Sequence, residues 1–443
     1  MDISFTHLGL RVPDILLPDP RIDLAKWATI ACDQYTSEQE YWTKVEEIVG
    51  DCPSTYHIIY PEIFLHAPDE AERIAFIQAN MDAYLADGVL APIGPGFILV
   101  ERTLTDGRTR TGLVAAVDLE AYDFSANSRS LIRPTERTIV DRIPPRLRIR
   151  EGATLESPHI MVLLDDPQET VLEPLTAQKE QLPLLYDTDL MLGGGHVRGY
   201  HIREEKYIAQ IADSLTRLLD EKKAQYGDPL LFAMGDGNHS LATAQACWDT
   251  IKKDLTPAER DNHPARYALV EIQNIHDPGN HFEPIHRALF SVDLNAFKDA
   301  LFSYCDDQNR RVTVETIPVF DMKKRVIPPA DNSAHSFVLL YGDECELVTV
   351  SPGLHYLPAG TVQRFLDRYL SEDKRAKVDY IHGRKALVSL AQKPETVGIY
   401  LPPVSKHSFF HTIVTEGVMP QKTFSMGEAE EKRYYLECRS IQP

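Results

Sequence analysis

The segment 235–240 combines residue types that could bind and position a phosphate. It reads Gly-Asp-Gly-Asn-His-Ser and follows the apolar run 230–234, which predicts a buried strand. The apolar residues after it recur with a period close to 3.6, so a helix capped by Asn238 or Ser240 should start here. Unpaired N–H groups and the positive end of the helix dipole favour an anion at such a helix start. The two glycines would let that anion approach the backbone closely.

Two side chains of this segment could take part in a reaction. Asp236 and His239 would flank the bound anion as catalytic groups, while Gly237, Asn238 and Ser240 would contact the phosphate. The alternative is an ordinary strand-to-helix turn, in which Asp236 caps the helix and His239 lies on the surface. The segment alone leaves both interpretations open.

Arginines form a second candidate site. Seven of them lie between residues 129 and 150, and only Glu136 and Asp141 oppose them, in a chain whose formal charge is −20. The rigid guanidinium fork matches phosphate oxygens, so Arg133, Arg142 and Arg146 are predicted to bind phosphate. The alternative is that the arginines at 146, 148 and 150 form the solvated face of a strand and pair with acids elsewhere.

A third polar spot is the segment 192–196, Leu-Gly-Gly-Gly-His. Successive glycines remove side-chain bulk where a ligand or another part of the backbone comes near. The segment lacks the spacing of a nucleotide fingerprint or a P-loop. Gly194, Gly195 and His196 are therefore candidate phosphate contacts, with a plain turn as the alternative.

The polar segment 33–38 follows the apolar stretch 27–32 and opens another predicted helix. It could form a second ligand loop. The simpler interpretation, which the sequence favours, is that Thr36 or Ser37 caps that helix.

Metal and hydrolase motifs are missing from the sequence. The histidines at 276, 281 and 286 are five residues apart, a spacing that suits neither adjacent helix turns nor one face of a strand. No His-Glu-x-x-His or Gly-x-Ser-x-Gly sequence occurs. We therefore expect neither a dedicated zinc site nor a serine hydrolase.

Composition limits the class of protein. With 43% hydrophobic and 25% charged residues, the chain resembles an ordinary globular protein. Its negative charge disfavours nucleic acid as a partner, because duplex binding depends on cation contacts with phosphates. No apolar run approaches the roughly 20 residues of a membrane span, and the six cysteines are scattered. We expect a cytoplasmic protein with reduced thiols, no membrane partner and a small-molecule substrate; a homodimer stays open.

Predicted strands and helices alternate irregularly along the chain. A hairpin is predicted over 97–103 and 109–117 around Asp106-Gly107, and helices over 38–48, 70–85, 204–219, 241–253 and 361–370. Further strands are predicted over 159–164, 267–275, 337–341, 346–350 and 397–401. Hairpins mixed with crossovers predict an α+β (mixed α/β) fold.

A chain of 443 residues should contain two or three substructures. We divide it into an N-terminal α+β region (1–125), a phosphate-binding core (126–300) and a C-terminal α+β region (301–443). Polar, proline-containing stretches at 254–266 and 327–336 are the expected exposed connections.

Several segments resemble a widespread prokaryotic family known as domain of unknown function 1015. They run from the first helix to the C-terminal part of the chain, and they are residues 26–36, 132–136, 141–146, 191–196, 234–240, 283–287, 378–383 and 417–422. The resemblance is specific and covers nearly the whole chain, but the family name implies no activity.

A more distant resemblance does imply one. The Asp-Gly-Asn-His sequence at 236–239 is similar to the Asp-Gly-His-His-Arg loop of the ParB/sulfiredoxin superfamily, which binds nucleotide phosphates at a helix start and includes free-serine kinases. This resemblance implies a ParB/sulfiredoxin-like core with additional mixed-sheet regions, and serine as a substrate. Ser240 stands where the related loop has arginine, so His286 and Arg287, or the arginine cluster, would supply the missing positive charge.

The leading hypothesis is a phosphotransferase that moves a phosphoryl group between ATP, ADP or pyrophosphate and a small hydroxylated metabolite such as serine. Such transfer needs charge neutralisation and positioning more than covalent help. Arg133, Arg142 and Arg287 would bind phosphate, Asp236 would hold Mg²⁺, and Glu136 or His239 would accept the hydroxyl proton. The alternatives are a phosphatase acting on phosphoserine or a similar compound, and a non-catalytic sensor of a nucleotide or phosphometabolite.

Overall fold

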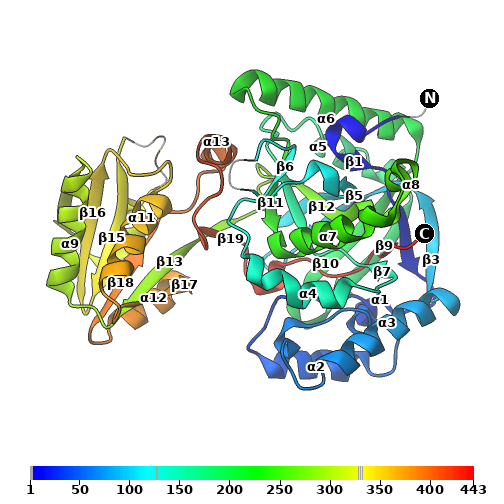
Figure 1. Cartoon of the computed structure of the whole chain (residues 1–443), viewed down its shortest axis with the longest axis horizontal. Helices are drawn as coiled ribbons and strands as arrows, with labels where there is room; N and C mark the ends of the chain where they lie inside the picture. The colour runs from blue at the N-terminus through cyan, green and yellow to red at the C-terminus, as the bar shows by residue number, and fades with distance from the viewer. Residues whose placement is uncertain (1–2, 126–127, 328, 330, 332) are drawn as a thin grey trace. The chain divides into compact units, whose positions relative to one another are not determined.

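The chain divides into two compact units. The structure is a computed structural model that describes residues 3–125, 128–327, 329, 331 and 333–443. Unit 1 comprises Met1–Asn280 and Glu428–Pro443, and unit 2 comprises His281–Gly427 (Figure 1). The predicted boundary at 125/126 falls inside unit 1 and the one at 300/301 inside unit 2. The C-terminal segment Glu428–Pro443 returns to unit 1, and no local pattern in the sequence predicts this return.

Unit 1 is built on a mixed sheet that has nine strands in the described part of the chain. Their order is β6-β11-β8-β12-β5-β4-β10-β9, with β1 beside β5. The pairs β6/β11 and β8/β12 are parallel, and the other pairs are antiparallel. The strands are β1 (Leu10–Arg11), β4 (Phe97–Thr103), β5 (Thr109–Asp118), β6 (Ile132–Arg133), β8 (Met161–Leu164), β9 (Leu184–Leu190), β10 (Gly195–Ile202), β11 (Phe232–Asp236) and β12 (Tyr267–Asn274).

Helices and short strands surround this sheet. The helices are α1 (Leu24–Trp27), α2 (Gln39–Val49), α3 (Glu70–Ala86), α4 (Ile143–Arg150), α5 (Glu173–Thr176), α6 (Glu205–Tyr226), α7 (Asn238–Ile251) and α8 (Pro257–Asn262). Two small antiparallel sheets pair β2 (Asp14–Pro18) with β3 (Leu90–Pro95), and β7 (Leu155–Glu156) with β20 (Arg439–Ser440).

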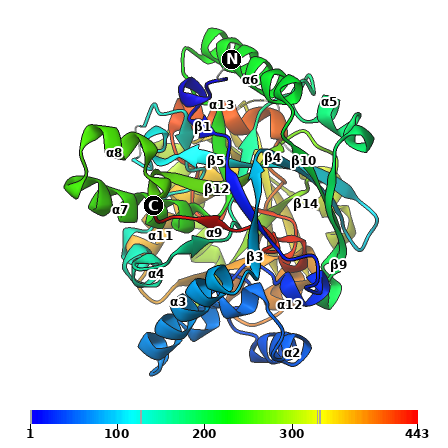
Figure 2. The ribbon, with the colours of Figure 1, turned by 90° about the vertical axis from the view of Figure 1, so that its right-hand side faces the viewer.

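The sheet of unit 1 has a hydrophobic core on each face, because alternate strand residues point to opposite sides. On one face, Leu99 and Leu113 pack in the core that contains the apolar residues of α6 and α7. On the other face, Ile98, Val100 and Val114 belong to the core that contains α2, α3 and the C-terminal segment. Figures 1 and 2 show α6 on one side of the sheet and α2 with α3 on the other.

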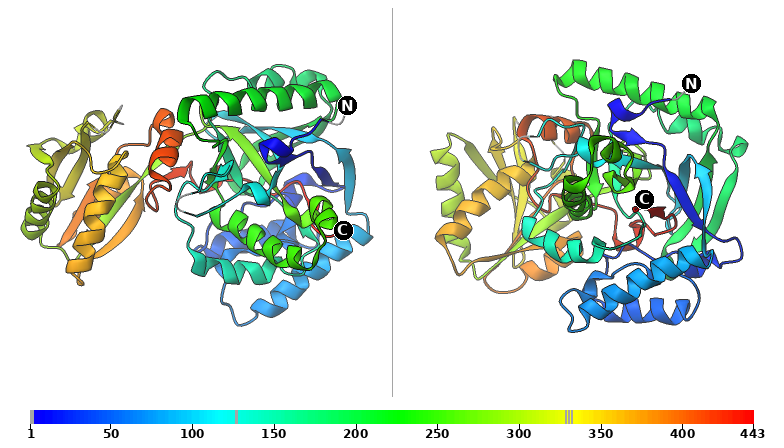
Figure 3. Two further views of the ribbon diagram at one scale, coloured as in Figure 1. Left: turned by 45° about the horizontal axis from the view of Figure 1, so that its top comes forward. Right: turned by 45° about the vertical axis from the view of Figure 1, so that its right-hand side comes forward.

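Unit 2 is a second, fully antiparallel sheet with seven strands in its described residues. The order is β14-β16-β15-β18-β13-β17, with β19 beside β13. Its strands are β13 (Phe282–Phe290), β14 (Arg311–Thr316), β15 (His335–Tyr341), β16 (Glu344–Ser351), β17 (Lys377–His382), β18 (Thr396–Tyr400) and β19 (Phe424–Met426). Its helices are α9 (Leu294–Asp307), α10 (Met322–Arg325), α11 (Pro358–Glu372), α12 (Arg384–Ala391) and α13 (Lys406–Glu416). Figure 3 shows α-helices packed along both faces of this sheet.

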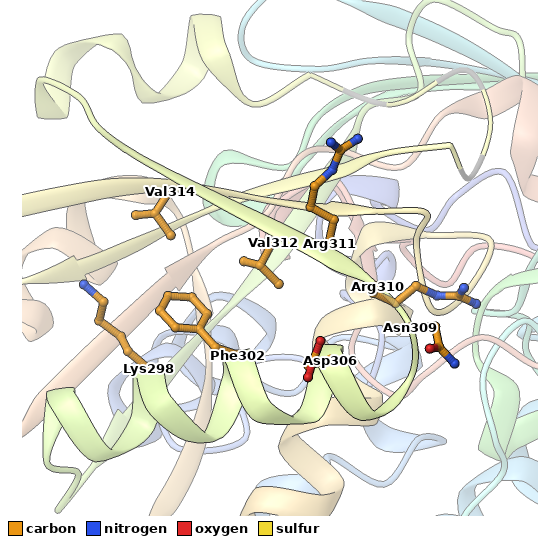
Figure 4. A pocket seen from close by; sticks show the side chains of 8 residues that line it. All are labelled: Lys298, Phe302, Asp306, Asn309, Arg310, Arg311, Val312 and Val314. Atoms are coloured by element: carbon orange, nitrogen blue, oxygen red, sulfur yellow. The ribbon is translucent and has the colours of Figure 1, made fainter.

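An open groove of about 840 Å³ lies in unit 2 between α9 and β14. Phe302 of α9 faces Val312 and Val314 of β14, whereas Arg311 points to the other side of the strand (Figure 4). None of the residues that the sequence singled out lines this groove.

The structure confirms the mixed α+β class and the predicted hairpin. β4 and β5 pair antiparallel, with Thr103 opposite Thr109 and Gly107 in the turn at a φ of 86°. Of the two expected connections, 254–266 contains the short helix α8, and 328, 330 and 332 of the other lie outside the described residues. Within the described residues, no helix combines the length and apolarity that a membrane crossing needs. All six cysteines are free thiols.

Candidate active site

The loop between β11 and α7 is shaped by Gly237. This residue has a φ of 80°, and a Cβ added to it would come 3.1 Å from the Cα of Ile160. Both the backbone conformation and the limited space therefore favour glycine. Gly237 is also the N-cap of α7, and no side chain among the described residues caps the helix. The prediction that Asn238 or Ser240 is the N-cap is therefore wrong, because the helix starts earlier than predicted. The first turn of α7 keeps backbone N–H groups that no capping side chain serves.

Asp236 lies at the end of β11 and forms an ion pair with Lys432. Lys432 Nζ is 3.0 Å from Oδ2, and the Gly237 N–H donates to Oδ1 at 2.9 Å. Burial alone would raise the pKa of Asp236, but the Lys432 ammonium, the ring of His159 and the Gly237 N–H together lower it. Asp236 is therefore an ionised carboxylate at neutral pH. Its side chain is 23% exposed, so a ligand can reach it, and it does not cap α7.

Ser240 is the start of a hydrogen-bonded chain of side chains. Its Oγ lies 2.9 Å from Nε2 of His159, and Nδ1 of the same ring lies 2.9 Å from the hydroxyl of Tyr435. The Tyr435 oxygen in turn accepts a hydrogen bond from the N–H of Cys32 at 3.0 Å. The chain fixes His159 beside Asp236, and it ties the start of α7 to the segment 32–38.

Glu62 and Arg146 form a second ion pair close to His159. Arg146 Nη2 lies 2.5 Å from Oε1 of Glu62, and the two side chains are 16% and 14% exposed. Burial raises the pKa of Glu62, Asp33 adds to the rise, and Arg146 and His159 oppose it. Glu62 therefore binds a proton more readily than an ordinary glutamate does, whereas Asp236 resists protonation. Two carboxylates with opposite pKa shifts are typical of sites that combine a proton acceptor with a fixed negative charge.

The other arginines of the segment 129–150 are mainly structural. Residues 143–150 form helix α4, with prolines in its first turn, and not a strand, so the strand alternative is wrong. Arg148 pairs with Glu70 at 2.6 Å and Arg150 pairs with Glu156 at 2.6 Å. The acidic excess of the chain therefore neutralises part of the basic segment. Only Arg146 of this helix reaches the cluster around His159.

Arg133 and Arg142 do not join this cluster by any contact in the described residues. Arg133 is buried in β6, where its guanidinium pairs with Asp228 and donates to the carbonyl of Ser128 at 2.9 Å. Arg142 is exposed, and its carbonyl oxygen accepts a hydrogen bond from Arg146 at 2.8 Å.

His239 and Glu136 belong to neighbouring segments. The N–H of Ile139 donates to Nε2 of His239 at 3.3 Å, which places the segment 136–139 beside the start of α7. Glu136 is half-buried. Asn238 has a buried Oδ1 without a hydrogen-bond partner among the described residues, at the first position of α7.

The glycine-rich segment 192–196 packs against the protein itself. A Cβ on Gly194 would come 2.6 Å from the Tyr434 ring, and one on Gly195 would come 2.2 Å from the carbonyl oxygen of Thr103. His196 is held by Asp187 at 2.6 Å and Asp189 at 2.7 Å. The glycines admit neighbouring protein atoms, which corresponds to the plain-turn interpretation.

His286 and Arg287 belong to unit 2 and are buried within it. Arg287 is fully buried on β13, where it donates to the carbonyls of Ile285, Lys422 and Gln421. His286 accepts a hydrogen bond from the N–H of Leu401 at 3.2 Å. Burial, with Arg287 and His382 nearby, lowers the pKa of His286 to about 3. These two side chains hold the backbone of unit 2 together.

The residues present do not fit the expected Mg²⁺ site at Asp236. The two carboxylate oxygens are already engaged by Lys432 and by the Gly237 N–H. No group of three or more potential ligand side chains occurs in the described part of the chain. The positive charge beside Asp236 is supplied by Lys432.

Sequence reasoning did not identify four members of this cluster: Glu62, His159, Lys432 and Tyr435. Asp33 was considered within a second ligand loop, but neither Thr36 nor Ser37 caps α2, whose N-cap is Glu38. Lys432 and Tyr435 lie almost two hundred positions after the loop that they support, and no local pattern links them to it.

Comparison with known proteins gives the family of the chain. A family model described as "Protein of unknown function (DUF1015)" matches residues 16–369. The chain belongs to this family. The resemblance noted in the sequence is thereby confirmed, while the family description carries no activity. No curated protein matches the chain.

Solved structures give distant matches. A free serine kinase in complex with AMP is 13% identical with a TM-score of 0.37, over 74% of this chain and 91% of that chain. A conserved hypothetical protein from Pyrococcus furiosus is 13% identical with a TM-score of 0.35, over 74% of this chain and 95% of that one. Likeness at this level does not establish a shared fold, so the ParB/sulfiredoxin-like core stays a prediction.

Proposed function

We propose that this protein is a phosphotransferase that moves a phosphoryl group between a nucleotide or pyrophosphate and a small hydroxylated metabolite, with serine as the first candidate. One observation carries the proposal. Three features lie around one histidine, His159. They are the helix start without a side-chain cap, the Asp236–Lys432 ion pair and the carboxyl of Glu62, whose pKa is raised.

The start of α7 is the proposed phosphate subsite. Its backbone N–H groups and the helix dipole favour a phosphate oxygen, and Gly237 presents no side chain in front of them. Lys432 can neutralise the charge that develops on the phosphoryl oxygens while Asp236 keeps it in place. Ser240 is held by His159 at 2.9 Å and can contribute its hydroxyl to the same oxygens.

Glu62 is the proposed proton acceptor. The substrate hydroxyl oxygen forms a bond to the terminal phosphorus, the bond from that phosphorus to the bridging oxygen breaks, and the hydroxyl proton passes to the Glu62 carboxylate. Arg146 lowers the pKa of Glu62 against the effect of burial, which favours the carboxylate form that accepts the proton. Of the two acceptors predicted from sequence, His239 already accepts from the Ile139 N–H through Nε2, and Glu136 stays as the second choice.

The test is ³¹P NMR of the purified protein in buffer containing Mg²⁺, with ATP, ADP or pyrophosphate as donor and serine as acceptor. The reverse direction uses phosphoserine as donor. We expect a new phosphomonoester signal, or a new nucleotide signal in reverse, in at least one pairing. Transfer in none of these pairings would contradict the serine form of the proposal. Inorganic phosphate released without an acceptor would indicate a phosphatase, and binding without turnover would indicate a sensor.

Lys432→Met gives the sharpest test of the site, and Lys222→Met is its matched control. Lys222 is also a buried lysine paired with an aspartate, since its Nζ lies 2.5 Å from Asp165, but it belongs to α6. Both variants should lose stability, because each removes the lysine partner of an aspartate that keeps one other contact, His276 for Asp165 and the Gly237 N–H for Asp236. Only Lys432→Met should abolish transfer per folded molecule. If Lys432→Met transfers phosphate as fast per folded molecule as Lys222→Met, Lys432 has no part in the mechanism.

A further inference from the structure

The strand β14 forms one edge of the unit 2 sheet. Six consecutive residue pairs join it to β16, from Arg311 opposite Ser351 to Thr316 opposite Glu346, and no other strand of the described residues pairs with it. In an antiparallel pair, alternate residues direct their N–H and C=O groups away from the neighbouring strand. The outer edge of β14 therefore carries a row of backbone groups with which a further strand could pair.

β14 lacks most of the features that protect an edge strand. The segment 311–316 contains no proline, and its pairing with β16 has no bulge. Five of its six residues are exposed, and the sixth, Val312, is half-buried. Val314 is 40% exposed, although valine is mostly an interior residue. A regular, exposed edge of this kind is a template for pairing with another chain.

The sequence of β14 fits an antiparallel copy of itself. Directly opposite residues both point their backbone groups toward the other strand or both away from it, so a two-fold axis must pass through a residue. An axis at Thr313 places Arg311 opposite Glu315 of the partner subunit, and Val312 opposite Val314 of the partner subunit. An axis at either neighbouring residue shortens the overlap and separates the two charges.

The charged side chains of β14 are available for this pairing. Arg311 is exposed, and no ion pair of its side chain occurs in the described part of the chain. Glu315 pairs with Arg325 of α10 at 2.6 Å, but the two side chains are 58% and 43% exposed, so this pair contributes at most about 1 kcal/mol. On β16, the residues opposite Arg311 and Glu315 are the uncharged Ser351 and Leu347. Glu315 would therefore lie between Arg325 of its own chain and Arg311 of the partner subunit.

The open groove between α9 and β14 would be filled by the same pairing. Val312 and Val314 face this groove together with Phe302 of α9 (Figure 4). Opposite residues of an antiparallel pair project from the same face, so the partner's two valines would enter the groove beside these side chains. Lys298 at the groove is engaged by Glu346 at 2.7 Å, which leaves the apolar side chains as the main unfilled contact surface.

We propose that the protein forms a homodimer in which the β14 strands of two copies pair antiparallel about a two-fold axis at Thr313. The unit 2 sheets of the two copies then join into one continuous sheet. Because both copies use the same surface, the interface closes at two subunits and leaves neither β14 edge free. The interface lies in unit 2 and does not rest on the proposed function, so a failure of phosphoryl transfer would leave it unaffected.

Two charge reversals and their mixture test the register by sedimentation equilibrium of the full chain. Arg311→Glu and Glu315→Arg each place like charges opposite each other twice in the dimer, so each variant alone should have a dissociation constant at least about tenfold higher than the wild type. A heterodimer of the two variants has opposite charges at both places again, so an equimolar mixture should recover dimerisation. Arg375→Glu, which reverses an 81% exposed arginine elsewhere in unit 2, should dimerise like the wild type.

The outcomes of this experiment separate the possible occupants of the edge. A wild-type protein that stays monomeric at every concentration would overturn the proposal and leave the edge to a strand from another protein. A dimer that neither reversal weakens would also overturn it, because the contact would then lie on another surface. Both reversed side chains are exposed, so the variants should keep the circular dichroism spectrum of the wild type.

A cysteine on the proposed axis gives an independent test. Thr313 would lie opposite its own copy with the Cβ atoms about 5 Å apart, so Thr313→Cys should form a covalent dimer under mild oxidation. Thr316→Cys is the matched control, because Thr316 is exposed on the same strand but would lie opposite residue 310 of the partner subunit. The wild type measures the background from its own thiols. Equal cross-linking of the two variants, or none in either, would overturn the axis at Thr313.

Discussion

The loop 235–240 and the segment 193–196 look alike in sequence and differ in how closely protein atoms approach their glycines. Both are polar, rich in glycine and contain a histidine. At Gly237 the glycine allows a tight passage from β11 into an uncapped helix, beside the Asp236–Lys432 ion pair. At Gly194 and Gly195 the space is filled by Tyr434 and by the backbone of Thr103.

This difference shows what a glycine motif can and cannot predict. Glycine reports that something comes close to the backbone, or that φ is positive. Whether the neighbour is a ligand or another part of the protein depends on contacts made by residues far away in sequence.

Asp236→Asn should have the largest effect. The amide keeps the shape of the side chain but removes the charge that holds Lys432, so we expect phosphoryl transfer to fall about 10²- to 10³-fold, as for loss of other preorganised electrostatic groups. Nucleotide affinity should change far less than the rate. Steady-state kinetics and a binding titration measure the two quantities. A rate within twofold of the wild type would mean that the loop, like the segment 193–196, takes no part in catalysis.

Gly195→Ala should destabilise the protein most among the glycine substitutions of its segment. Its methyl group would meet the Thr103 carbonyl oxygen at 2.2 Å, at a residue whose φ is 78°. We expect a loss of about 3 kcal/mol in the free energy of unfolding, from overpacking combined with backbone strain.

Gly193→Ala is the matched control for that substitution. Its φ is 82°, but in the described part of the chain no atom beyond its two chain neighbours lies within 4 Å of the added Cβ, so only the backbone strain of about 1 kcal/mol remains. Denaturant melts of the two variants separate the steric cost from the strain. Equal losses would mean that no protein atoms crowd Gly195, and that the segment keeps room for a ligand.

The local structure of the loop 235–240 could be predicted from sequence, whereas the strands β9 and β10 that flank the other segment were not predicted. The partners of the side chains could be predicted in neither region. The run 230–234 and the period of the following residues predicted β11 and α7, because hydrophobic patterns repeat at short range. The strand alternative for Arg146 was wrong because Pro144 and Pro145 start a helix there. Lys432, His159 and Glu62 come from separate segments, and only the return of the C-terminal segment to unit 1 brings Lys432 to Asp236. Long-range pairings of this kind leave no local periodicity.

The partners of Arg287 could not be predicted from sequence for the same reason. As an arginine next to a histidine it had the residue types of an anion site, yet its guanidinium is used by three backbone carbonyls inside unit 2. A buried guanidinium needs acceptors, and backbone carbonyls serve as well as phosphate does. The sequence contains no signal that separates the two uses.

Arg146→Gln should move the pH dependence of transfer. Burial raises the pKa of Glu62 and Arg146 opposes this rise, so removing Arg146 raises the pKa further. Because the proposed acceptor must be deprotonated, the rate increases with pH through the pKa of Glu62, and this limb should shift to higher pH in the variant. Arg148→Gln, which removes an exposed partner of Glu70, should leave the limb in place. A pH–rate profile that is identical in the wild type and Arg146→Gln would exclude Glu62 as the acceptor.

His196→Ala should have the smallest effect. Its ring is 29% exposed and is held by Asp187 and Asp189, and surface pairs of this kind contribute between 0 and about 1 kcal/mol. The free energy of unfolding should therefore fall by less than about 1 kcal/mol, and transfer per folded molecule should not change. If instead nucleotide or phosphoserine affinity drops in this variant while the unfolding curve is unchanged, the segment 193–196 binds a ligand after all. The contrast between the two glycine-rich regions would then lie in which ligand each one binds, and the pairing of His196 with two aspartates would describe only the ligand-free protein.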